Sequence, residues 1–266
     1  MCESSIKFSL FGILCMLIAP FSFAVETLKP LGEQSELILR QTAMPVLDET
    51  HLGKILNRHY NQGLGGPENW EKIESLRVTG SLYVGDRELE MAAYQKKPNL
   101  IKMTLVSKNG SLILGYDGEQ AWRHLPNTKD ESAAPMVSEE ARRFVHVSSF
   151  GNFLLYPYRL GKTISFIDTV PLNGNICHQI RVTLETDFQI DYYIDIRTYL
   201  ETKVVNFDIE NQRTNSIIFS DYRWEAGMPV AQKVVNYENG QVVSQIDIEE
   251  VQVNTGVMPW MFKIPR

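Results

Sequence analysis

Apolar and polar residues alternate with a period of two along most of the chain from Ser75 to its end. Leu76, Val78 and Leu82 alternate with polar or small residues, which is typical of a strand with one buried face. The alternation recurs in segments 89–97, 100–106, 111–116, 120–124, 163–169, 176–185, 189–195, 202–209, 216–224, 230–237 and 242–253. Because short turns join consecutive strands, neighbouring strands are antiparallel.

Residue pairs that favour tight turns separate these strands. Asn109-Gly110, Asp117-Gly118, Asn173-Gly174 and Asn239-Gly240 each lie between two alternating segments. Asparagine, aspartate and glycine tolerate the positive φ angles that a tight hairpin needs. The sequence therefore predicts one long meander of about eleven or twelve strands.

A helical segment precedes the meander. Leu52, Ile55 and Leu56 recur at helical spacing, and Asp48 is the expected N-cap. Pro67 opens a short second turn, since proline suits the first position of a helix. This segment ends where the period-two alternation begins.

A second helical segment follows the polar loop 126–135. Ser138 is the expected N-cap, and the acidic Glu139 and Glu140 occupy the first turn, where the helix dipole favours negative charge. We expect this helix and its continuation to be a lid over an apolar cavity, with loop 126–135 allowing it to move. The candidate cavity and lid residues are Phe144, Val147, Phe150, Phe153, Leu154, Met91 and Met103.

These elements predict an α+β fold that is mostly antiparallel β. A single sheet of about eleven strands twists and curls, so we expect an unclosed half-barrel whose concave face is covered by the helices. Such a hollow either encloses apolar space for a ligand or is filled by side chains, and the pattern leaves both alternatives open.

The N-terminus has the layout of a secretory signal peptide. Lys7 precedes an apolar run over 8–23, and small residues at Ser22 and Ala24 form a cleavage site before Val25. The alternative is a retained membrane anchor, for which the run is short. We therefore expect a signal peptide at 1–24, a flexible leader at 25–45 and one domain at 46–266, with no transmembrane span after cleavage.

Composition and charge narrow the function. Of the 266 residues, 44% are hydrophobic and 22% are charged, which is ordinary for a globular domain. The net charge of -6 and the lack of a basic stripe argue against nucleic-acid binding. Cleavage would leave Cys177 as the one cysteine, so no internal disulfide is expected, and a buried structural thiol is favoured over a nucleophile.

The sequence carries no recognisable catalytic or metal motif. No His-Glu-x-x-His pattern, cysteine pair or Gly-x-Ser-x-Gly elbow occurs. Asp187, Asp191 and Asp195 share one strand face, which we interpret as a solvated face. We therefore expect no cofactor, no metal and no enzymatic activity.

Five short segments stand in order along the chain: Gly-Gly-Pro-Glu-Asn-Trp-Glu-Lys-Ile at 65–73, Tyr-Gln-Lys-Lys-Pro-Asn at 94–99, Tyr-Asp-Gly-Glu-Gln-Ala-Trp at 116–122, Tyr-Ile-Asp-Ile-Arg-Thr-Tyr-Leu at 193–200 and Phe-Lys-Ile-Pro at 262–265. Together they resemble the LolA-like family of outer-membrane lipoprotein-sorting proteins. One departure is Ile196, where relatives often carry proline. The resemblance runs from about residue 49 to 265.

The resemblance implies an unclosed β-barrel capped by helices and a periplasmic location. It also implies a non-enzymatic carrier or sensor that binds a lipid, an acyl chain or a lipoprotein in an apolar concavity. The alternative is a structural or interaction module of the cell envelope with a filled interior and an envelope protein as its partner. None of the five segments is itself a functional site, so the resemblance predicts the fold and carries function over only by analogy.

Overall fold

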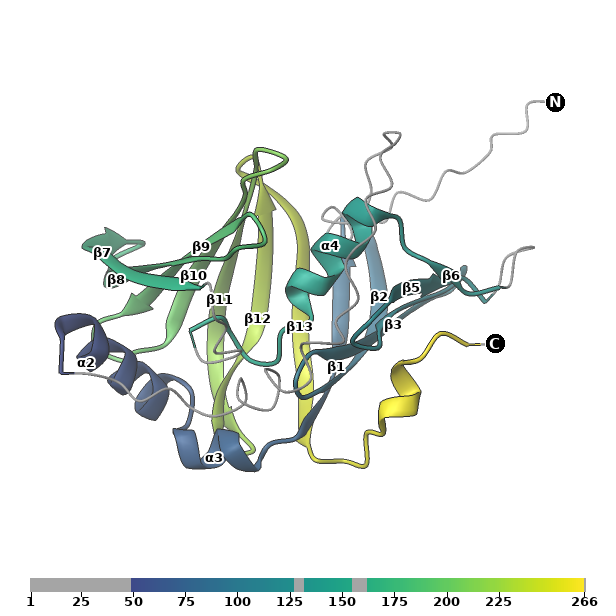
Figure 1. Cartoon of the computed structure of the whole chain (residues 1–266), viewed down its shortest axis with the longest axis horizontal. Coiled ribbons are helices and arrows are strands. Elements are labelled where there is room, and N and C mark those ends of the chain that lie inside the picture. The colour runs from purple at the N-terminus through teal and green to yellow at the C-terminus, as the bar shows by residue number, and fades with distance from the viewer. Residues whose placement is uncertain (1–48, 127–131, 155–161, 266) are drawn as a thin grey trace.

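The computed structural model describes residues 49–126, 132–154 and 162–265 (Figure 1). The helical elements are α2 (His51–Arg58), the π-helical turn η2 (His59–Gly63), α3 (Pro67–Lys72), α4 (Ser138–Val147) and the 3-10 turn η3 (Pro259–Phe262). The strands are β1 (Ser75–Val84), β2 (Arg87–Lys96), β3 (Leu100–Ser107), β4 (Gly110–Tyr116), β5 (Ala121–His124), β6 (Ala134–Pro135), β7 (Thr163–Leu172), β8 (Asn175–Thr183), β9 (Phe188–Asp195), β10 (Glu201–Asp208), β11 (Arg213–Glu225), β12 (Met228–Glu238) and β13 (Gln241–Val253).

The strands form one unclosed, curved antiparallel sheet (Figure 1). Its order is β6-β5-β4-β3-β2-β1-β13-β12-β11-β10-β9-β8-β7, so the first and last long strands pair at the middle. Leu76 lies opposite Val253, and Leu82 lies opposite Ile246. The structure confirms the predicted, mostly antiparallel fold, and the unclosed sheet has the form of a half-barrel.

The sheet has thirteen strands rather than about eleven. β6 is a two-residue strand in the segment that the sequence predicts as loop 126–135, and it pairs with Trp122 and Arg123 of β5. A strand of two residues contains no full alternation, so the period-two pattern could not indicate it.

Two of the four predicted Asn-Gly and Asp-Gly turns have positive φ at both residues, whereas at Asn109-Gly110 and Asp117-Gly118 only the glycine does. Asn173 and Gly174 have φ angles of 49° and 84°, and Asn239 and Gly240 have φ angles of 51° and 77°. Positive φ at both central residues gives a turn whose twist matches that of the flanking strands.

Two clusters of buried apolar side chains lie on the same face of the sheet, which we call the inner face. Leu76 belongs to the first cluster and Leu82 to the second, and their even spacing on β1 directs both side chains to that face. The first cluster joins α2, η2, α3 and residues 150–154 to β8, β9 and β10. The second joins α4 to β1, β2, β3, β4 and β5.

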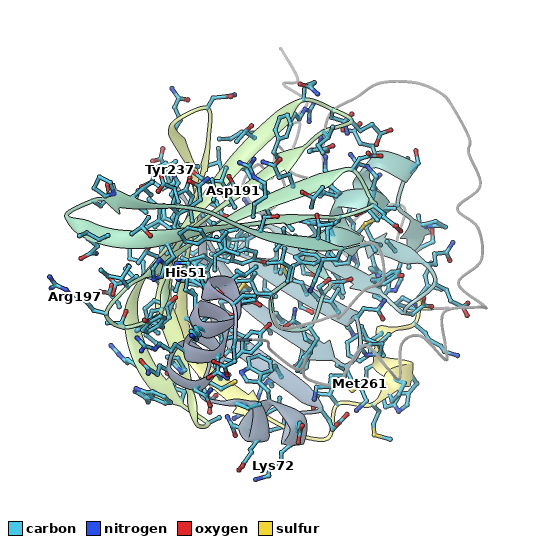
Figure 2. All side chains as sticks on the ribbon, turned by 60° about the vertical axis from the view of Figure 1, so that its left-hand side comes forward. His51, Lys72, Asp191, Arg197, Tyr237 and Met261 are labelled. Atoms are coloured by element: carbon cyan, nitrogen blue, oxygen red, sulfur yellow. The ribbon has the colours of Figure 1, made fainter. Side chains whose placement is uncertain are left out.

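A local signal starts α2, whereas the predicted cap of α4 is wrong: Ser138 is the first residue of that helix, and Val137 is its N-cap, without a side-chain hydrogen bond. The Thr50 hydroxyl accepts a hydrogen bond from the Gly53 amide at 3.1 Å, so Thr50 is the N-cap of α2. Asp48, the predicted N-cap, and the predicted signal peptide and leader lie outside the described residues. In Figure 2, His51 and Lys72 mark the start of α2 and the end of α3. Within the described part of the chain, no helix has the length and apolar character needed to cross a membrane.

Candidate functional site

An apolar cavity of about 270 Å³ lies on the inner face, between the α3 end of the helical segment and the middle of the sheet. Small-molecule sites usually measure ~300–1,000 Å³, so this volume suits a slender ligand. The lining residues are Gly63, Leu64, Trp70, Leu76, Val78, Gln95, Gly151, Asn152, Glu201, Phe219, Tyr222, Met228, Pro229, Val230, Ala231, Val234, Ile248 and Val251.

The floor of the cavity is the apolar surface of the central strands. Val78 lies opposite Val251, and Phe219 lies opposite Val234. Each of these side chains is only partly buried, although the strands around them are fully paired. Exposed apolar surface of this kind inside a concavity favours an apolar ligand over water.

Glycines let the helical segment approach the sheet closely at one end of the cavity. Gly65 has a φ angle of 86°, and a Cβ atom there would lie 2.1 Å from the Gly227 carbonyl oxygen. A Cβ atom on Gly63 would lie 2.0 Å from the Tyr199 carbonyl oxygen. No other residue type fits these contacts. Gly63 at the end of η2 and Gly65 in the turn after it therefore bring the chain close to the sheet just before α3, whose Trp70 lines the cavity.

Three polar side chains meet beside the cavity. The Asn152 amide donates a short hydrogen bond to Oε1 of Glu201, and its nitrogen lies 3.4 Å from Nε2 of His59. The same Glu201 oxygen lies 3.5 Å from His59 Nε2. His59 is fully buried, and its Nδ1 lies 2.8 Å from the Tyr199 carbonyl oxygen. Glu201 and Asn152 line the cavity directly.

Two tyrosines, the buried Tyr192 and the partly buried Tyr222, respond to the Glu201 carboxylate. Burial raises the pKa of Tyr192 and of Tyr222 well above the ordinary value, and the negative charge of Glu201 raises both further. The Tyr222 hydroxyl donates to the Glu201 carbonyl oxygen at 2.7 Å. The Tyr192 hydroxyl accepts a hydrogen bond from the Phe153 amide at 3.0 Å. Both phenols therefore stay neutral and act as fixed dipoles.

The predicted cavity and lid residues divide between the two clusters. Phe150, Phe153 and Leu154 belong to the first cluster, and they flank Gly151 and Asn152, which line the cavity. Phe144 and Met91 are buried in the second cluster, and Met103 packs against it. Val147 lies at the end of α4 with 41% of its surface exposed.

The sequence analysis missed the polar group formed by His59, Asn152 and Glu201. These residues come from η2, from the segment after α4 and from the first position of β10. No short motif contains them, and only the pairing of β10 with β9 and the packing of η2 bring them together. The one signal in the sequence that could have indicated this group is Glu201, an acidic residue at the start of the alternating strand β10.

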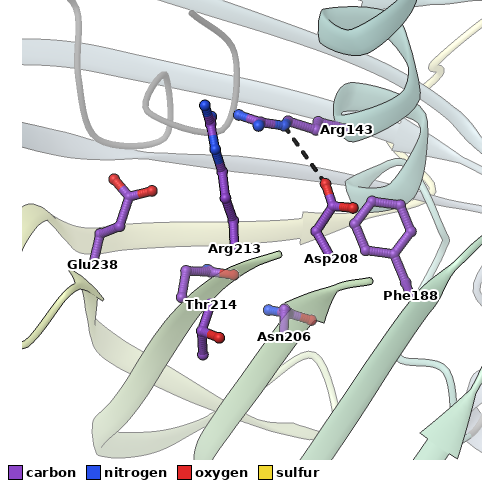
Figure 3. Close-up of a pocket in the computed structure, with 8 residues that line it drawn as sticks. Arg143, Phe188, Asn206, Asp208, Arg213, Thr214 and Glu238 are labelled. Atoms are coloured by element: carbon purple, nitrogen blue, oxygen red, sulfur yellow. Dashed lines mark ion pairs between the residues drawn. The ribbon is translucent and has the colours of Figure 1, made fainter. Parts of the chain in front are cut away.

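A second, smaller pocket lies beside α4 (Figure 3). It is lined by Arg143, Phe188, Asn206, Asp208, Arg213, Thr214, Asn215 and Glu238, and it measures about 20 Å³. That is enough for one water molecule, which needs ~10–15 Å³, and too little for a ligand.

The residues around this pocket hold α4 in place. Arg142 donates to both carboxylate oxygens of Asp208 at 2.6 Å, and Arg143 lies 3.9 Å from the same carboxylate. Burial would raise the pKa of Asp208, but hydrogen bonds from Arg142 and Asn211 outweigh that effect and hold the pKa below its ordinary value. We therefore assign this pocket a structural role.

The other candidate functional residues, a cysteine and two aspartates, have structural roles. Cys177 is fully buried, as predicted, and burial raises the pKa of its thiol. Asp191 and Asp195 are buried, not solvated as the sequence suggested, because Arg181 binds Asp191 at 2.7 Å and the turn after β9 donates to Asp195. Among the described residues, no three histidine, cysteine or acidic side chains form a metal-binding group.

No model of a protein family matches the sequence, and no curated protein is similar to it at a significant level. Solved structures do match. A DUF1329 family protein from Desulfovibrio piger superposes with a TM-score of 0.57 at 10% identity, covering 79% of this chain and 96% of its own. A domain assigned to outer membrane lipoprotein sorting, from Vibrio parahaemolyticus, gives a TM-score of 0.56 at 11% identity, covering 79% and 94%.

A LolA superfamily protein from Nitrosomonas europaea gives a TM-score of 0.52 at 9% identity, covering 82% of this chain and 98% of its own. Identities this low concern the fold and not a shared activity. The strand order, the inner-face clusters and these superpositions agree with the resemblance found in the sequence. The thirteen-stranded unclosed sheet of this chain is therefore a LolA-like fold.

Proposed function

We propose that this protein is a non-enzymatic carrier or sensor that binds an acyl chain, of a lipid or of a lipoprotein, in the cavity on the inner face. The observation that carries the proposal is an apolar cavity of about 270 Å³ in the middle of a fully paired sheet. Burying one methylene group from water is worth ~0.8 kcal/mol, so even a short segment of chain would bind with useful affinity. The similarity to a lipoprotein-sorting domain supports the same function.

In this proposal the helices roof the concave face. Trp70 of α3 closes one end of the cavity, and its indole nitrogen donates to the Leu64 carbonyl oxygen at 2.6 Å. The segment 150–154 is the lid, because Phe150, Phe153 and Leu154 anchor it on either side of the two residues that line the cavity. Phe144, Val147, Met91 and Met103 extend the roofed region toward α4. Hydrogen exchange would test the lid, since bound ligand should slow exchange at 150–154.

The location follows from the N-terminal sequence. We propose that residues 1–24 are removed on export across the inner membrane, that 25–45 is a flexible leader, and that the domain 46–266 works in the periplasm. Intact-mass analysis of the protein purified from cells tests the cleavage, because the mature chain should begin at Val25. A chain that keeps residues 1–24 would favour the membrane anchor.

The central experiment is extraction of the purified native protein with organic solvent, followed by mass spectrometry of the extract. We expect acyl-containing molecules at a substantial fraction of the protein concentration. In parallel, the neutral probe N-phenyl-1-naphthylamine should gain fluorescence and saturate. An extract without acyl chains, together with no saturable fluorescence, would remove the support for a carrier.

The alternative is an interaction module of the envelope. Trp224 and Trp260 favour it, because 67% and 69% of their surfaces are exposed, and exposed tryptophans are common at protein interfaces. In that case Trp224→Ala or Trp260→Ala would release the protein from the envelope fraction while the cavity stayed empty. The carrier proposal expects both variants to keep probe binding.

A further inference from the structure

The cavity contains an acid. Of the described residues that line it, Glu201 is the single charged one, and the others are apolar side chains, glycines, two amides and a tyrosine. The Glu201 side chain is 13% exposed. Removing a carboxylate this far from water is unfavourable unless other groups bind it. The groups around Glu201 therefore show how far the protein itself binds the two oxygens of this carboxylate.

Among the described residues, the protein supplies one oxygen of the carboxylate with a single hydrogen-bond donor, the Asn152 amide. A carbonyl oxygen only accepts hydrogen bonds, so His59 Nδ1, 2.8 Å from the Tyr199 carbonyl, carries a proton. In the neutral ring Nε2 is then an acceptor. The Asn152 amide has two hydrogens, and it can give one to Nε2 of His59 and one to Oε1 of Glu201. The Leu154 amide fixes this orientation by donating to Oδ1 of Asn152 at 3.0 Å.

The second oxygen of the carboxylate, Oε2, accepts no hydrogen bond from the described residues. Across 49–126, 132–154 and 162–265, both polar contacts of the Glu201 carboxylate, with Asn152 and with His59, go to Oε1. No lysine or arginine of the described chain forms an ion pair with Glu201, and none lines the cavity. Glu201 is thus held in one orientation, and its second oxygen, which no described group binds, stays accessible to water or to a ligand in the cavity.

We propose that Glu201 binds the head group of the ligand, and that the ligand is a single-chain amphiphile whose head donates hydrogen bonds, such as an alcohol, an amide or an ammonium group. Asn152 is a positioning residue that orients the carboxylate, and His59 in turn orients the Asn152 amide. The inference rests on the proposed function and narrows it. A free fatty acid is the wrong ligand at neutral pH, because its carboxylate would lie next to that of Glu201 without a cation between them.

Three probes with the same ten-carbon tail test the head group: decylamine, 1-decanol and decanoate. Each would compete with N-phenyl-1-naphthylamine for the wild-type protein at pH 7.5. Hydrogen bonds to a charged group are strong, so we expect decylamine and 1-decanol to displace the probe at concentrations at least about tenfold lower than decanoate. The uncharged 1-decanol separates the Glu201 contact from attraction to the negative protein as a whole.

Glu201→Gln keeps the size of the side chain and removes its charge. We expect this variant to bring the affinities of the three probes to within about threefold of one another while it still binds N-phenyl-1-naphthylamine. Glu119→Gln is the matched control, because it removes the same charge from the exposed turn after β4, and it should keep the wild-type preference.

Each outcome decides between the two proposals. Decanoate that competes as well as 1-decanol in the wild type, or a preference that survives in Glu201→Gln, would overturn the head-group assignment and leave the apolar cavity in place. The absence of saturable binding by any probe would overturn the carrier function itself. If Glu201→Gln does not fold, Glu201→Leu takes its place, and it should likewise bring the affinities of the three probes together.

Discussion

The two apolar clusters on the inner face differ in how completely their helices fill the space above the sheet. In the second cluster Phe144 of α4 is only 1% exposed and packs with Leu105 and Leu114. In the first cluster η2 and α3 pack at one end of the strands and leave a cavity of about 270 Å³ beside them. One face of one sheet is thus filled in one place and open in another.

The difference teaches that the helix attachment, not the strand pattern, decides where a site can form. Arg142 and Asp208 hold α4 close to the sheet through two hydrogen bonds of 2.6 Å. The other helical segment is held through close backbone approaches at Gly63 and Gly65. That contact lies at the end of the strands, so the middle of the floor stays uncovered.

The largest expected effect comes from emptying the filled region. Phe144→Ala removes a fully buried aromatic ring, and the free energy of unfolding should fall by about 3–5 kcal/mol. Denaturant titration followed by tryptophan fluorescence measures the change.

Val147→Ala on the same helix is the matched control, since Val147 is 41% exposed, and it should change stability by less than about 0.5 kcal/mol. Equal losses in the two variants would mean that the α4 region is not tightly filled.

The next effect comes from releasing α4. Asp208→Asn leaves Arg142 without its carboxylate partner on Nη2, and we expect a loss of about 2–3 kcal/mol in the free energy of unfolding. The loss should be smaller than for a fully buried pair because Arg142 is partly exposed and keeps Glu210 at 3.0 Å. Asp86→Asn, in an exposed turn, makes the same charge change and should be nearly neutral. A stability for Asp208→Asn equal to that of the wild type would show that the ion pair does not hold the helix.

Low pH should remove the stabilisation that the Arg142–Asp208 ion pair contributes. The pKa of Asp208 in the folded protein lies below its ordinary value, which is about 3.9 in an unfolded chain. The folded state therefore releases the proton more readily, so the stabilisation is complete above about pH 4 and is lost as the pH falls through the folded-state pKa. The stability gap between the wild type and Asp208→Asn should narrow below about pH 4. A gap that stays constant down to pH 2 would contradict this assignment.

The smallest effect on stability should come from filling the open region. Val230→Phe adds a ring at the cavity wall, where space is available, so the free energy of unfolding should change by less than about 1 kcal/mol. Binding of N-phenyl-1-naphthylamine should nevertheless weaken by about tenfold or more, because the ring occupies the ligand space. Val242→Phe, on an exposed part of β13, is the control. Undiminished probe binding by Val230→Phe would place the ligand elsewhere.

Much of the fold could be predicted because strands and hairpins have local causes. The alternation that starts at Leu76 gives the inner face, and Asn173-Gly174 and Asn239-Gly240 set turns that the structure contains. The exceptions also have local causes. β6 is too short to show a period, and the N-cap of α2 is Thr50, the residue directly before the helix.

The site could be predicted only in part, because it depends on packing. The sequence analysis named Phe144 and Phe153 as candidate cavity and lid residues, but the pattern could not indicate which of them lies near empty space. The contact of Glu201 with His59 joins residues from distant segments and depends on where η2 lies. Whether a buried acid has its own partner or waits for a ligand is decided by distances that no pattern of residue types contains.

The pairing of β1 with β13 has a consequence for how the domain is made. The strand that joins the early and late parts of the sheet is the last long one to be synthesised. Until it arrives, β1 has an open edge with an apolar face, a state that is prone to aggregation. Contacts between residues so distant in sequence form slowly. Deleting β13 would therefore split the sheet at its centre instead of trimming its border, and a nascent chain would need protection until β13 has been made.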